Sequence, residues 1–369
     1  MPEAVPVTFV SSHAQLGGAE RYLETLFAGL GPDWVAGVVC LQDGPLVDRL
    51  HARGLPTAVL DTRAGPFAIG RSAVRLRRLL LRNRPEVVHA NGVKAALVSV
   101  LATPGTGIPL VWMKHDFSGD GALARSVAWL CREVVGVSEA VVETFGASDK
   151  VSVVHNGLPE SHVDRASGRR RLEEALGIDG PAKIVTLVGR VDPVKGQDEL
   201  LAIAPELLRR VPEARVAFIG ADSPAQPGHG AELRASVERD GLGAAVSFLG
   251  FRDDALELIA GSDALVVATV PYKRRFGREG FGYVGLEAFS AGTPVVAYED
   301  GALREVLGDC ALLVPAGDRA ALLDGVVRVL EDGALRETLT RCGRDRVANS
   351  FSVEAMVEAM KERYLAAAA

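Results

Sequence analysis

The sequence lacks the features by which several classes of protein are recognised. Its 369 residues include only four cysteines, with no CxxC pair and no cluster of histidine and cysteine, so we expect neither a zinc site nor a disulfide framework. The first residues, MPEAVPVTFVSS, have no basic segment before a short apolar run, which is typical of a first strand and not of a signal peptide. No apolar stretch is long enough to span a bilayer. We therefore expect a cytoplasmic protein with reduced thiols.

A basic excess is also missing. The net charge is −6 at pH 7, which argues against a nucleic-acid partner. With 48% hydrophobic and 24% charged residues, the composition is ordinary for a globular protein. The length predicts two domains.

Short runs rich in valine and isoleucine alternate with longer helical patterns along the whole chain. Most of these runs are apolar at every position, as in parallel strands buried on both faces. The pattern predicts an α/β protein with two Rossmann-like, doubly wound parallel sheets, whose domains face a central cleft. The expected strands are residues 5–12, 35–42, 56–62, 86–92, 109–116, 132–138, 150–157, 183–191, 214–221, 245–251, 264–270, 294–300 and 311–317.

A polar, charged segment, 158–182, separates the two halves and is expected to be a linker with a short helix. We expect an N-terminal domain of residues 1–160 and a C-terminal domain of residues 161–350. Residues 351–369 have a helical pattern, and we expect this helix to pack back on the N-terminal domain. Further helical patterns occupy, for example, 196–210, 231–241 and 318–333.

Loops that follow strands are the candidate sites, because doubly wound sheets bind ligands at the carboxyl ends of their strands. After the first strand, Gly17 and Gly18 let the backbone approach a ligand, and the following helix offers free amides to a phosphate. A plain strand–helix turn is equally compatible with these residues. The absence of GxGxxG disfavours a dinucleotide-dependent dehydrogenase.

Two other strand ends in the first half carry polar residues. His115 and Asp116 form either an acid/base pair or a contact to a sugar hydroxyl, or the histidine is simply packed and hydrogen-bonded. Asn156 and Gly157 end the last strand of this half and are also compatible with a simple turn.

The second half opens with a strand, a loop that contains Arg190 and Lys195, and a helix. A diphosphate requires fixed positive charge and oriented amides. Arg190 can supply a bidentate fork and Lys195 a point charge. The alternative is a pair of exposed cations on a loop.

Glu279 and Glu287 flank a glycine-containing stretch in which a helix is expected to begin near Phe281. A helical rise of about 1.5 Å per residue separates the two carboxylates by roughly 12 Å. Glycosidase carboxylates are only about 5–9.5 Å apart. We therefore interpret the two acids as contacts to two parts of one extended ligand, such as the hexose and the ribose of a nucleotide sugar.

The stretch from Glu279 to Glu287 resembles the EX7E motif of retaining GT-B glycosyltransferases. Its context, GREGFGYVGLEAFSAGTPVVAYEDGALREV, resembles the GT4 family, glycosyl transferase group 1. The resemblance continues in Gly17-Gly18-Ala19-Glu20, His115-Asp116, Asn156-Gly157, Gly189-Arg190 with Lys195-Gly196, and Phe351-Ser352.

This resemblance implies a retaining, metal-independent hexosyltransferase without a cofactor, which moves a sugar from a UDP- or GDP-sugar to a hydroxyl of a small-molecule, glycan or lipid acceptor. The N-terminal domain would hold the acceptor and the C-terminal domain the donor. Arg190 and Lys195 would bind the diphosphate, Glu279 the sugar hydroxyls and Glu287 the ribose. The other implied donor contacts are Gly189, the amides of Gly280, Phe281 and Gly282, the base contacts Phe251 and Arg252, and Gly17 and Gly18, which would face the phosphates or the acceptor.

The implied catalytic residues are His115, which would reach the sugar from the first domain, together with Glu279, Arg190 and Lys195. His13, Asn91, Asp116 and Asn156 are acceptor candidates. Two departures from the family pattern affect the pockets. Asp300-Gly301 replaces the usual glycine pair, and the insert 273–278 is longer and more basic than expected. An epimerase-type nucleotide-sugar enzyme or oxidoreductase and a non-catalytic sugar-nucleotide-binding partner protein remain alternatives.

The segment from Arg71 to Arg84 predicts a basic amphipathic helix. Arg71, Arg75, Arg78 and Arg82 share one helical face, with leucines elsewhere on the wheel. Such a helix can dock on an anionic membrane, here at the inner face. The alternative is a solvated helix that packs on the sheet.

Overall fold

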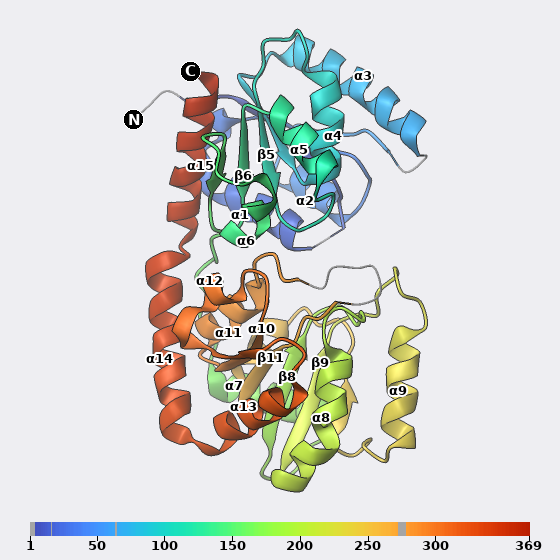
Figure 1. Cartoon of the computed structure of the whole chain (residues 1–369), viewed down its shortest axis with the longest axis vertical. Helices are drawn as coiled ribbons and strands as arrows, with labels where there is room; N and C mark the ends of the chain where they lie inside the picture. Colours follow the sequence, from blue (N-terminus) through green and yellow to red (C-terminus); the bar gives the residue numbers. More distant parts are fainter. Residues whose placement is uncertain (1–3, 16, 63–64, 272–277) are drawn as a thin grey trace. The chain divides into compact units, whose positions relative to one another are not determined.

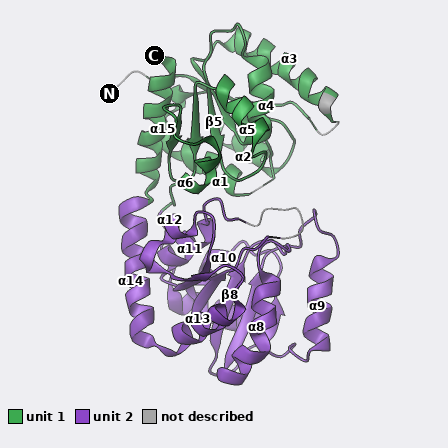
Figure 2. Cartoon of the chain, viewed as in Figure 1, with its two compact units in different colours: residues 1–159, 351–369 green, residues 160–350 purple. Residues whose placement is uncertain are grey.

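A computed structural model of the chain describes residues 4–15, 17–62, 65–271 and 278–369 (Figure 1). The chain divides into two compact units, Met1–Pro159 with Phe351–Ala369, and Glu160–Ser350 (Figure 2). The sequence had placed these divisions after residues 160 and 350. We call the two parts unit 1 and unit 2.

Unit 1 contains a seven-stranded parallel sheet in the order β3-β2-β1-β4-β5-β6-β7. Its central strands are buried and apolar on both faces, as parallel strands covered by helices must be. The strands are β1 (Val7–Ser11), β2 (Val35–Cys40), β3 (Thr57–Val59), β4 (Val87–Asn91), β5 (Leu110–Lys114), β6 (Glu133–Gly136) and β7 (Val151–Val153).

Helices cover both faces of this sheet. α3, α4 and α5 share one apolar core with one face of the strands and form a single helical layer, visible on one side of the sheet in Figure 1. α15, the C-terminal helix, lies against α1. The helices of unit 1 are α1 (Gly18–Gly29), α2 (Pro45–Ala52), α3 (Pro66–Asn83), α4 (Val93–Ala102), α5 (Ala122–Leu130), α6 (Glu139–Val142) and α15 (Val353–Ala368).

Unit 2 contains a six-stranded parallel sheet in the order β10-β9-β8-β11-β12-β13. Its strands are β8 (Lys183–Val188), β9 (Ala214–Ile219), β10 (Val246–Phe248), β11 (Ala264–Val267), β12 (Val295–Glu299) and β13 (Leu312–Pro315). Its helices are α7 (Arg165–Leu176), α8 (Gln197–Arg210), α9 (His229–Arg239), α10 (Ala255–Ala260), α11 (Tyr283–Ala291), α12 (Leu303–Leu307), α13 (Arg319–Glu331) and α14 (Gly333–Ser350).

The two predicted doubly wound sheets are therefore confirmed, and every expected strand is present in the expected place. Several strands are shorter than predicted, however. The expected strand 150–157 is reduced to β7, and 245–251 to β10. The apolar run continues beyond β7 because residues 154–158 are mostly buried, whereas after β10 Leu249 is half-buried and Phe251 is exposed.

The segment expected to be a linker, 158–182, belongs to unit 2 from Glu160 onward. α7 contributes the wholly buried Leu172 to a small core with strands β8 and β9. Arg165 and Arg169 both form ion pairs with Asp263, at 2.9 and 2.7 Å. Gly168 touches α10 so closely that a Cβ there would lie 2.1 Å from the carbonyl oxygen of Glu257. The polar appearance of this segment comes from its outer face and from arginines that are paired.

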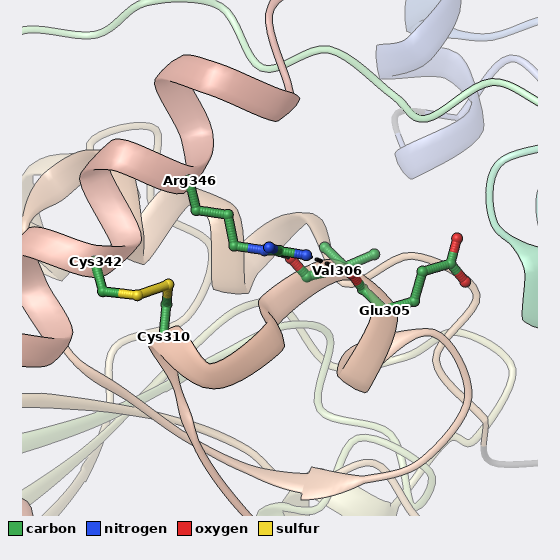
Figure 3. Close-up of a disulfide and its surroundings, with 5 residues drawn as sticks. All are labelled: Glu305, Val306, Cys310, Cys342 and Arg346. Atoms are coloured by element: carbon green, nitrogen blue, oxygen red, sulfur yellow. Dashed lines mark hydrogen bonds between the residues drawn. A yellow bond between two sulfur atoms is a disulfide. The ribbon is translucent and has the colours of Figure 1, made fainter.

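Cys310 and Cys342 form a disulfide bond (Figure 3), so the expectation that the cysteines are all reduced thiols is wrong. The bond joins the turn after α12 to α14. One helical turn further along α14, Arg346 donates to the carbonyl oxygens of Val306 at 2.7 Å and Glu305 at 2.6 Å. The disulfide and Arg346 together hold the C-terminal end of α12 on α14.

Removing this disulfide should destabilise the protein. The bond closes a segment with a sequence separation of 32 residues, for which the loss of chain entropy in the unfolded state corresponds to about 3–4 kcal/mol. We expect Cys342→Ser to lower the free energy of unfolding by about this amount, as measured by urea denaturation without reductant. Cys131→Ser, at a buried free thiol, is the control for the loss of a sulfur atom. If the denatured, unreduced wild-type protein has four reactive thiols, no disulfide exists.

Candidate functional site

The loop between β8 and α8 has a fixed shape. The Lys195 amide donates to the carbonyl oxygen of Asp192 at 2.8 Å, which closes a turn. The buried Asp192 carboxylate accepts a hydrogen bond from the Ser223 hydroxyl at 2.8 Å. Gly196 has φ +82°, and a Cβ there would lie 2.0 Å from the carbonyl oxygen of Ala268. Only glycine fits this position, which places the start of α8 directly against the loop after β11.

Arg190 and Lys195 both project from this loop, and of the two only Lys195 is paired with a described residue. The Arg190 guanidinium is exposed and forms no hydrogen bond or ion pair within residues 4–15, 17–62, 65–271 and 278–369. The backbone of Arg190 is fixed, because its carbonyl oxygen accepts from the Gln197 amide at 2.9 Å. The Lys195 ammonium lies 3.0 Å from Oε2 of Glu279. The loop therefore presents one available cation and one that is already balanced by a carboxylate.

The Glu279 carboxylate is held by two donors on neighbouring strand ends. Oε2 accepts from the Lys195 ammonium and from the Thr269 hydroxyl, each at 3.0 Å. Burial raises the pKa of this carboxyl group, but the charge of Lys195 and the two hydrogen bonds outweigh burial, so the pKa lies below its ordinary value. Glu279 is therefore ionised at neutral pH and can accept hydrogen bonds from hydroxyl groups.

The glycine-containing stretch after Glu279 leads into α11. Gly282 is the N-cap, with φ +86°, and a Cβ there would lie 2.6 Å from Cδ2 of Leu303. The helix begins at Tyr283, two residues after the predicted start at Phe281. The predicted separation of roughly 12 Å between Glu279 and Glu287 assumed a continuous helix, and that assumption is wrong. Glu287 lies in the second turn of α11 and is half-buried.

The segment after β12 supports the backbone of Glu279. The Ala302 amide donates to the carbonyl oxygen of Glu279 at 2.9 Å. Gly301 has φ +58°, and a Cβ there would lie 2.2 Å from the same oxygen. Asp300, the departure from the family pattern, forms an ion pair with Arg278 at 3.4 Å. Residues 272–277, most of the predicted basic insert, lie outside the described residues.

Phe251 and Arg252 follow β10, on the far side of β8 from Glu279 in the strand order. The Phe251 ring is exposed. The Arg252 guanidinium binds Asp254 through two hydrogen bonds of 2.7 Å. Its charge is therefore balanced, which leaves the Phe251 ring and the backbone as the surfaces that this loop offers to a base.

In unit 1, His115 and Asn91 meet at the carboxyl ends of β5 and β4. The His115 Nε2 lies 2.5 Å from Oδ1 of Asn91, and the Asn91 amide donates to the carbonyl oxygen of Ala19 at 3.1 Å. Burial lowers the pKa of His115 to about 4. Of the alternatives open from the sequence, the geometry does not favour an acid/base pair with Asp116, because that carboxylate is exposed and accepts from the Ser118 amide at 2.9 Å. At neutral pH His115 is an uncharged, packed histidine.

Gly17 and Gly18 lie at the start of α1, as predicted. Gly17 is the N-cap in an extended conformation, and a Cβ there would lie 3.1 Å from a carboxylate oxygen of Glu20. A carboxylate at a helix N-terminus opposes the binding of a phosphate. His13 is exposed, with Nδ1 3.3 Å from Oε1 of Gln42.

Gly157 and Leu158 have a structural role. A Cβ at Gly157 would lie 2.6 Å from Cα of Val353, at the start of α15. The Leu158 amide donates to the carbonyl oxygen of Phe351 at 2.8 Å. Asn156 is 2% exposed, and its contact with the acceptor stays a prediction. The contacts of Gly157 and Leu158 fix α15 within unit 1.

Comparisons with known proteins agree with this geometry. The profile of the family Glycosyl transferases group 1 matches residues 168–346. The profile of Glycosyltransferase Family 4 matches residues 16–162. The phosphatidyl-myo-inositol mannosyltransferase of Mycobacterium leprae is 32% identical over 288 residues, which cover 74% of this chain and 71% of that protein. The chain belongs to the group 1 glycosyltransferases. It is thus an enzyme of the hexosyltransferase type, as the sequence predicted.

Other relatives extend over more of this glycosyltransferase. The glycogen synthase of Mycobacterium tuberculosis is 28% identical, covering 83% of the chain and 76% of that protein. Among solved structures, Anabaena Alr3699/HepE in complex with UDP and glucose has a TM-score of 0.86 at 24% identity. The structural alignment covers 98% of this chain and 100% of the HepE chain. This structural similarity confirms the GT-B fold.

The glycosyltransferase has supporting residues that sequence reasoning missed. Thr269 donates to Glu279, and Ser223 holds Asp192. Thr269 comes two residues after β11 and Ser223 four residues after β9, and this position in the loops after apolar strands is the sequence signal that could have indicated them. Within the described residues, no group of three or more histidine, cysteine, aspartate or glutamate residues could hold a metal ion. None of the described helices is both long and apolar enough to cross a bilayer.

Two buried histidines of unit 1 should make the glycosyltransferase sensitive to acid. Burial lowers the pKa of His89 to about 3 and that of His115 to about 4. Below about pH 6.5 the unfolded chain binds protons at both residues before the folded chain does. Stability therefore falls as the pH falls through this window, by about 1.4 kcal/mol per pH unit for each histidine.

The measurement is the free energy of unfolding in urea between pH 7 and pH 4.5. We expect His89→Gln to reduce the slope of the free energy of unfolding against pH by the contribution of one histidine, about 1.4 kcal/mol per pH unit. His51→Gln, on the exposed side of α2, is the control and should leave the slope unchanged. Equal slopes in all three proteins would show that His89 does not titrate in this way.

Proposed function

We propose that this enzyme is a retaining glycosyltransferase that moves a hexose from a UDP- or GDP-sugar to an acceptor hydroxyl without a metal ion. The observation that carries the proposal is the contact among Glu279, Lys195 and Thr269. Arg190, on the same loop as Lys195, is unpaired within the residues that the structure describes. These groups present a carboxylate for sugar hydroxyls and cations for a diphosphate at one edge of the sheet.

The charges suit the departure of a nucleoside diphosphate. Negative charge develops on the leaving phosphate in the transition state, and preorganised cations and amides stabilise it. Arg190 is available for a bidentate contact with a phosphate. The Lys195 ammonium can bind a phosphate oxygen either in place of the Glu279 carboxylate or in addition to it. The amides at the start of α11 add the partial positive charge of a helix N-terminus. These groups supply the charge that a divalent metal provides in other transferases.

In the proposed donor complex, Glu279 accepts hydrogen bonds from hydroxyls of the transferred sugar, Glu287 binds the ribose, and Phe251 lies beside the base. In a retaining reaction of this kind the acceptor attacks from the face that the diphosphate leaves, and a phosphate oxygen takes the proton. His115, neutral at the end of β5, is proposed to accept a hydrogen bond from a sugar hydroxyl at Nδ1, because its Nε2–H donates to Oδ1 of Asn91. Support for UDP as the nucleotide comes from the structural neighbour that holds UDP and glucose.

The test is a screen of nucleotide sugars by thermal unfolding. A donor that is present at a concentration of 100 times its Kd stabilises the protein by about 2.7 kcal/mol. The stabilising donor is then incubated with candidate acceptors, and the anomeric configuration of the first product is read by proton NMR. We expect the configuration of the donor to be kept. An inverted product would refute retention. Binding without transfer or donor hydrolysis would favour a non-catalytic sugar-nucleotide-binding protein.

We also propose that α3 docks the enzyme on an anionic membrane. Its arginines Arg71, Arg75, Arg78 and Arg82 are exposed and form no hydrogen bond or ion pair with the described parts of the chain. Leu76 and Leu80 face the core. Electrostatic docking of this kind weakens as the salt concentration rises.

A further inference from the structure

We propose that the layer formed by α3, α4 and α5 inserts apolar side chains into an anionic lipid bilayer, with Phe67 and Trp129 as its aromatic anchors. This rests on the proposed docking of α3 and extends it from an electrostatic contact of one helix to an insertion face on three.

Exposed apolar side chains are concentrated on this layer. The described chain has nine exposed large hydrophobic residues, and seven of them lie on these three helices. The remaining two are Val59 and Phe251. Apolar groups that are scattered singly over a surface need no explanation, whereas their concentration in one region is typical of a binding face.

On α3 the exposed apolar residues form a stripe. Phe67, Val74 and Leu81 are spaced seven residues apart and therefore lie on nearly the same side of the helix. Phe67 is 94% exposed. Successive arginines, including Arg71 and Arg78, alternate with these residues on the same exposed face. A face that mixes apolar side chains with arginines suits the boundary between lipid headgroups and acyl chains.

The other two helices continue the layer. α4 lies between α3 and α5 and exposes Leu101 near its end. α5 exposes Leu123, Trp129 and Leu130. The Trp129 ring is 76% exposed, although indole is the side chain that most strongly prefers the membrane interface.

The charge of the layer selects an anionic surface. The chain contains 47 aspartate and glutamate residues, yet not one lies within α3, α4 or α5. The same helices contain six arginines and Lys94. An acidic protein with a locally basic and apolar layer matches an anionic bilayer, since it would be attracted by charge and held by insertion.

The distribution of tryptophan supplies a direct readout. The chain has three tryptophans. Trp34 and Trp112 are buried, at 7% and 0% exposure, so a change in emission on vesicles reports mainly on Trp129. The probe is a set of vesicles of phosphatidylcholine alone and of phosphatidylcholine mixed with phosphatidylglycerol.

We expect the emission of the wild type to shift to shorter wavelength with the anionic vesicles only, and to be quenched by lipids brominated on the acyl chain.

Trp129→Phe should still bind but lose the shift. Phe67→Ser combined with Trp129→Ser should remove the part of the binding that survives high salt. Arg71→Gln combined with Arg78→Gln should lower the partition coefficient at low salt about tenfold or more. Arg209→Gln combined with Arg239→Gln, on unit 2, makes the same change in charge and should have no effect.

The outcomes separate insertion from docking and from catalysis. Salt-sensitive binding without a shift of Trp129 emission would leave docking intact and overturn insertion, as would equal binding to neutral vesicles. If a soluble polyanion such as heparin binds as tightly as the vesicles, the layer is a nucleic-acid or polyanion site. If the protein dimerises without lipid and Phe67→Ser with Trp129→Ser abolishes the dimer, the layer is an interface between two copies. Donor binding should be unchanged in every variant. A failure of the proposed transferase function would appear in donor binding, and a failure of insertion would appear in the vesicle measurements.

Discussion

Replacement of Glu279 by glutamine is expected to lower kcat/KM by about 10²–10³-fold, because the transition state loses a preorganised charged contact. The amide keeps the size of the side chain but cannot balance the Lys195 ammonium at 3.0 Å. Lys195→Met should cause a loss of similar size. Initial rates of nucleoside diphosphate release measure both effects.

The ion pair between Lys195 and Glu279 leads to two further predictions. The double variant should be only slightly worse than either single variant, since residues that act as a unit are not additive. Because Lys195 helps to lower the pKa of Glu279, Lys195→Met should move the acid limb of the pH–rate profile to higher pH. Additive losses and an unmoved acid limb would contradict the pairing. Glu206→Gln, an exposed acid paired with Arg209 on α8, is the control and should keep wild-type rates.

Replacement of Gly301 by alanine is expected to reduce both stability and activity. The added Cβ would lie 2.2 Å from the carbonyl oxygen of Glu279, at a backbone φ of +58° that disfavours any side chain. The backbone of Glu279 must shift to relieve this contact. We expect a loss of about 2–4 kcal/mol in the free energy of unfolding. We also expect at least a tenfold loss in kcat/KM, since small displacements of catalytic groups are costly.

Gly317 offers a matched control for this substitution. Its φ is +78°, but a Cβ there would meet nothing within 4 Å. Gly317→Ala should therefore cost only about 1 kcal/mol, from the backbone conformation alone, and should leave turnover unchanged. If the two variants lose equal stability and both remain active, the close approach between Gly301 and Glu279 is not important for the site.

The sequence predicted the sheets well because parallel strands must be apolar on both faces, which leaves a clear pattern. It also predicted the loop of Arg190 and Lys195, since cations between a strand and a helix are a local signal. The contact between Lys195 and Glu279 joins residues that are 84 positions apart. It follows from the neighbouring positions of β8 and β11 in the sheet, which no local pattern specifies.

The errors have the same origin. Cys310 and Cys342 follow no recognised spacing, and they meet because α14 packs back on the turn after α12. Gly157 resembles a site residue at the end of a strand, but it packs against the start of α15, almost 200 residues later in the chain. His115 and Asp116 are adjacent in sequence, and their side chains nevertheless bind different partners. In each case the outcome depends on tertiary contacts that periodicity and spacing do not encode.

The most direct test of the donor site is a calorimetric titration of the protein with UDP and with GDP. We predict that one of these nucleotides binds to the wild type, and that Arg190→Gln and Lys195→Met each weaken its binding about 10–100-fold, the value of a charge-assisted hydrogen bond. Arg209→Gln, at the far end of α8, should bind as tightly as the wild type. Unchanged affinity in both Arg190→Gln and Lys195→Met would show that the diphosphate is not bound at this edge of the sheet.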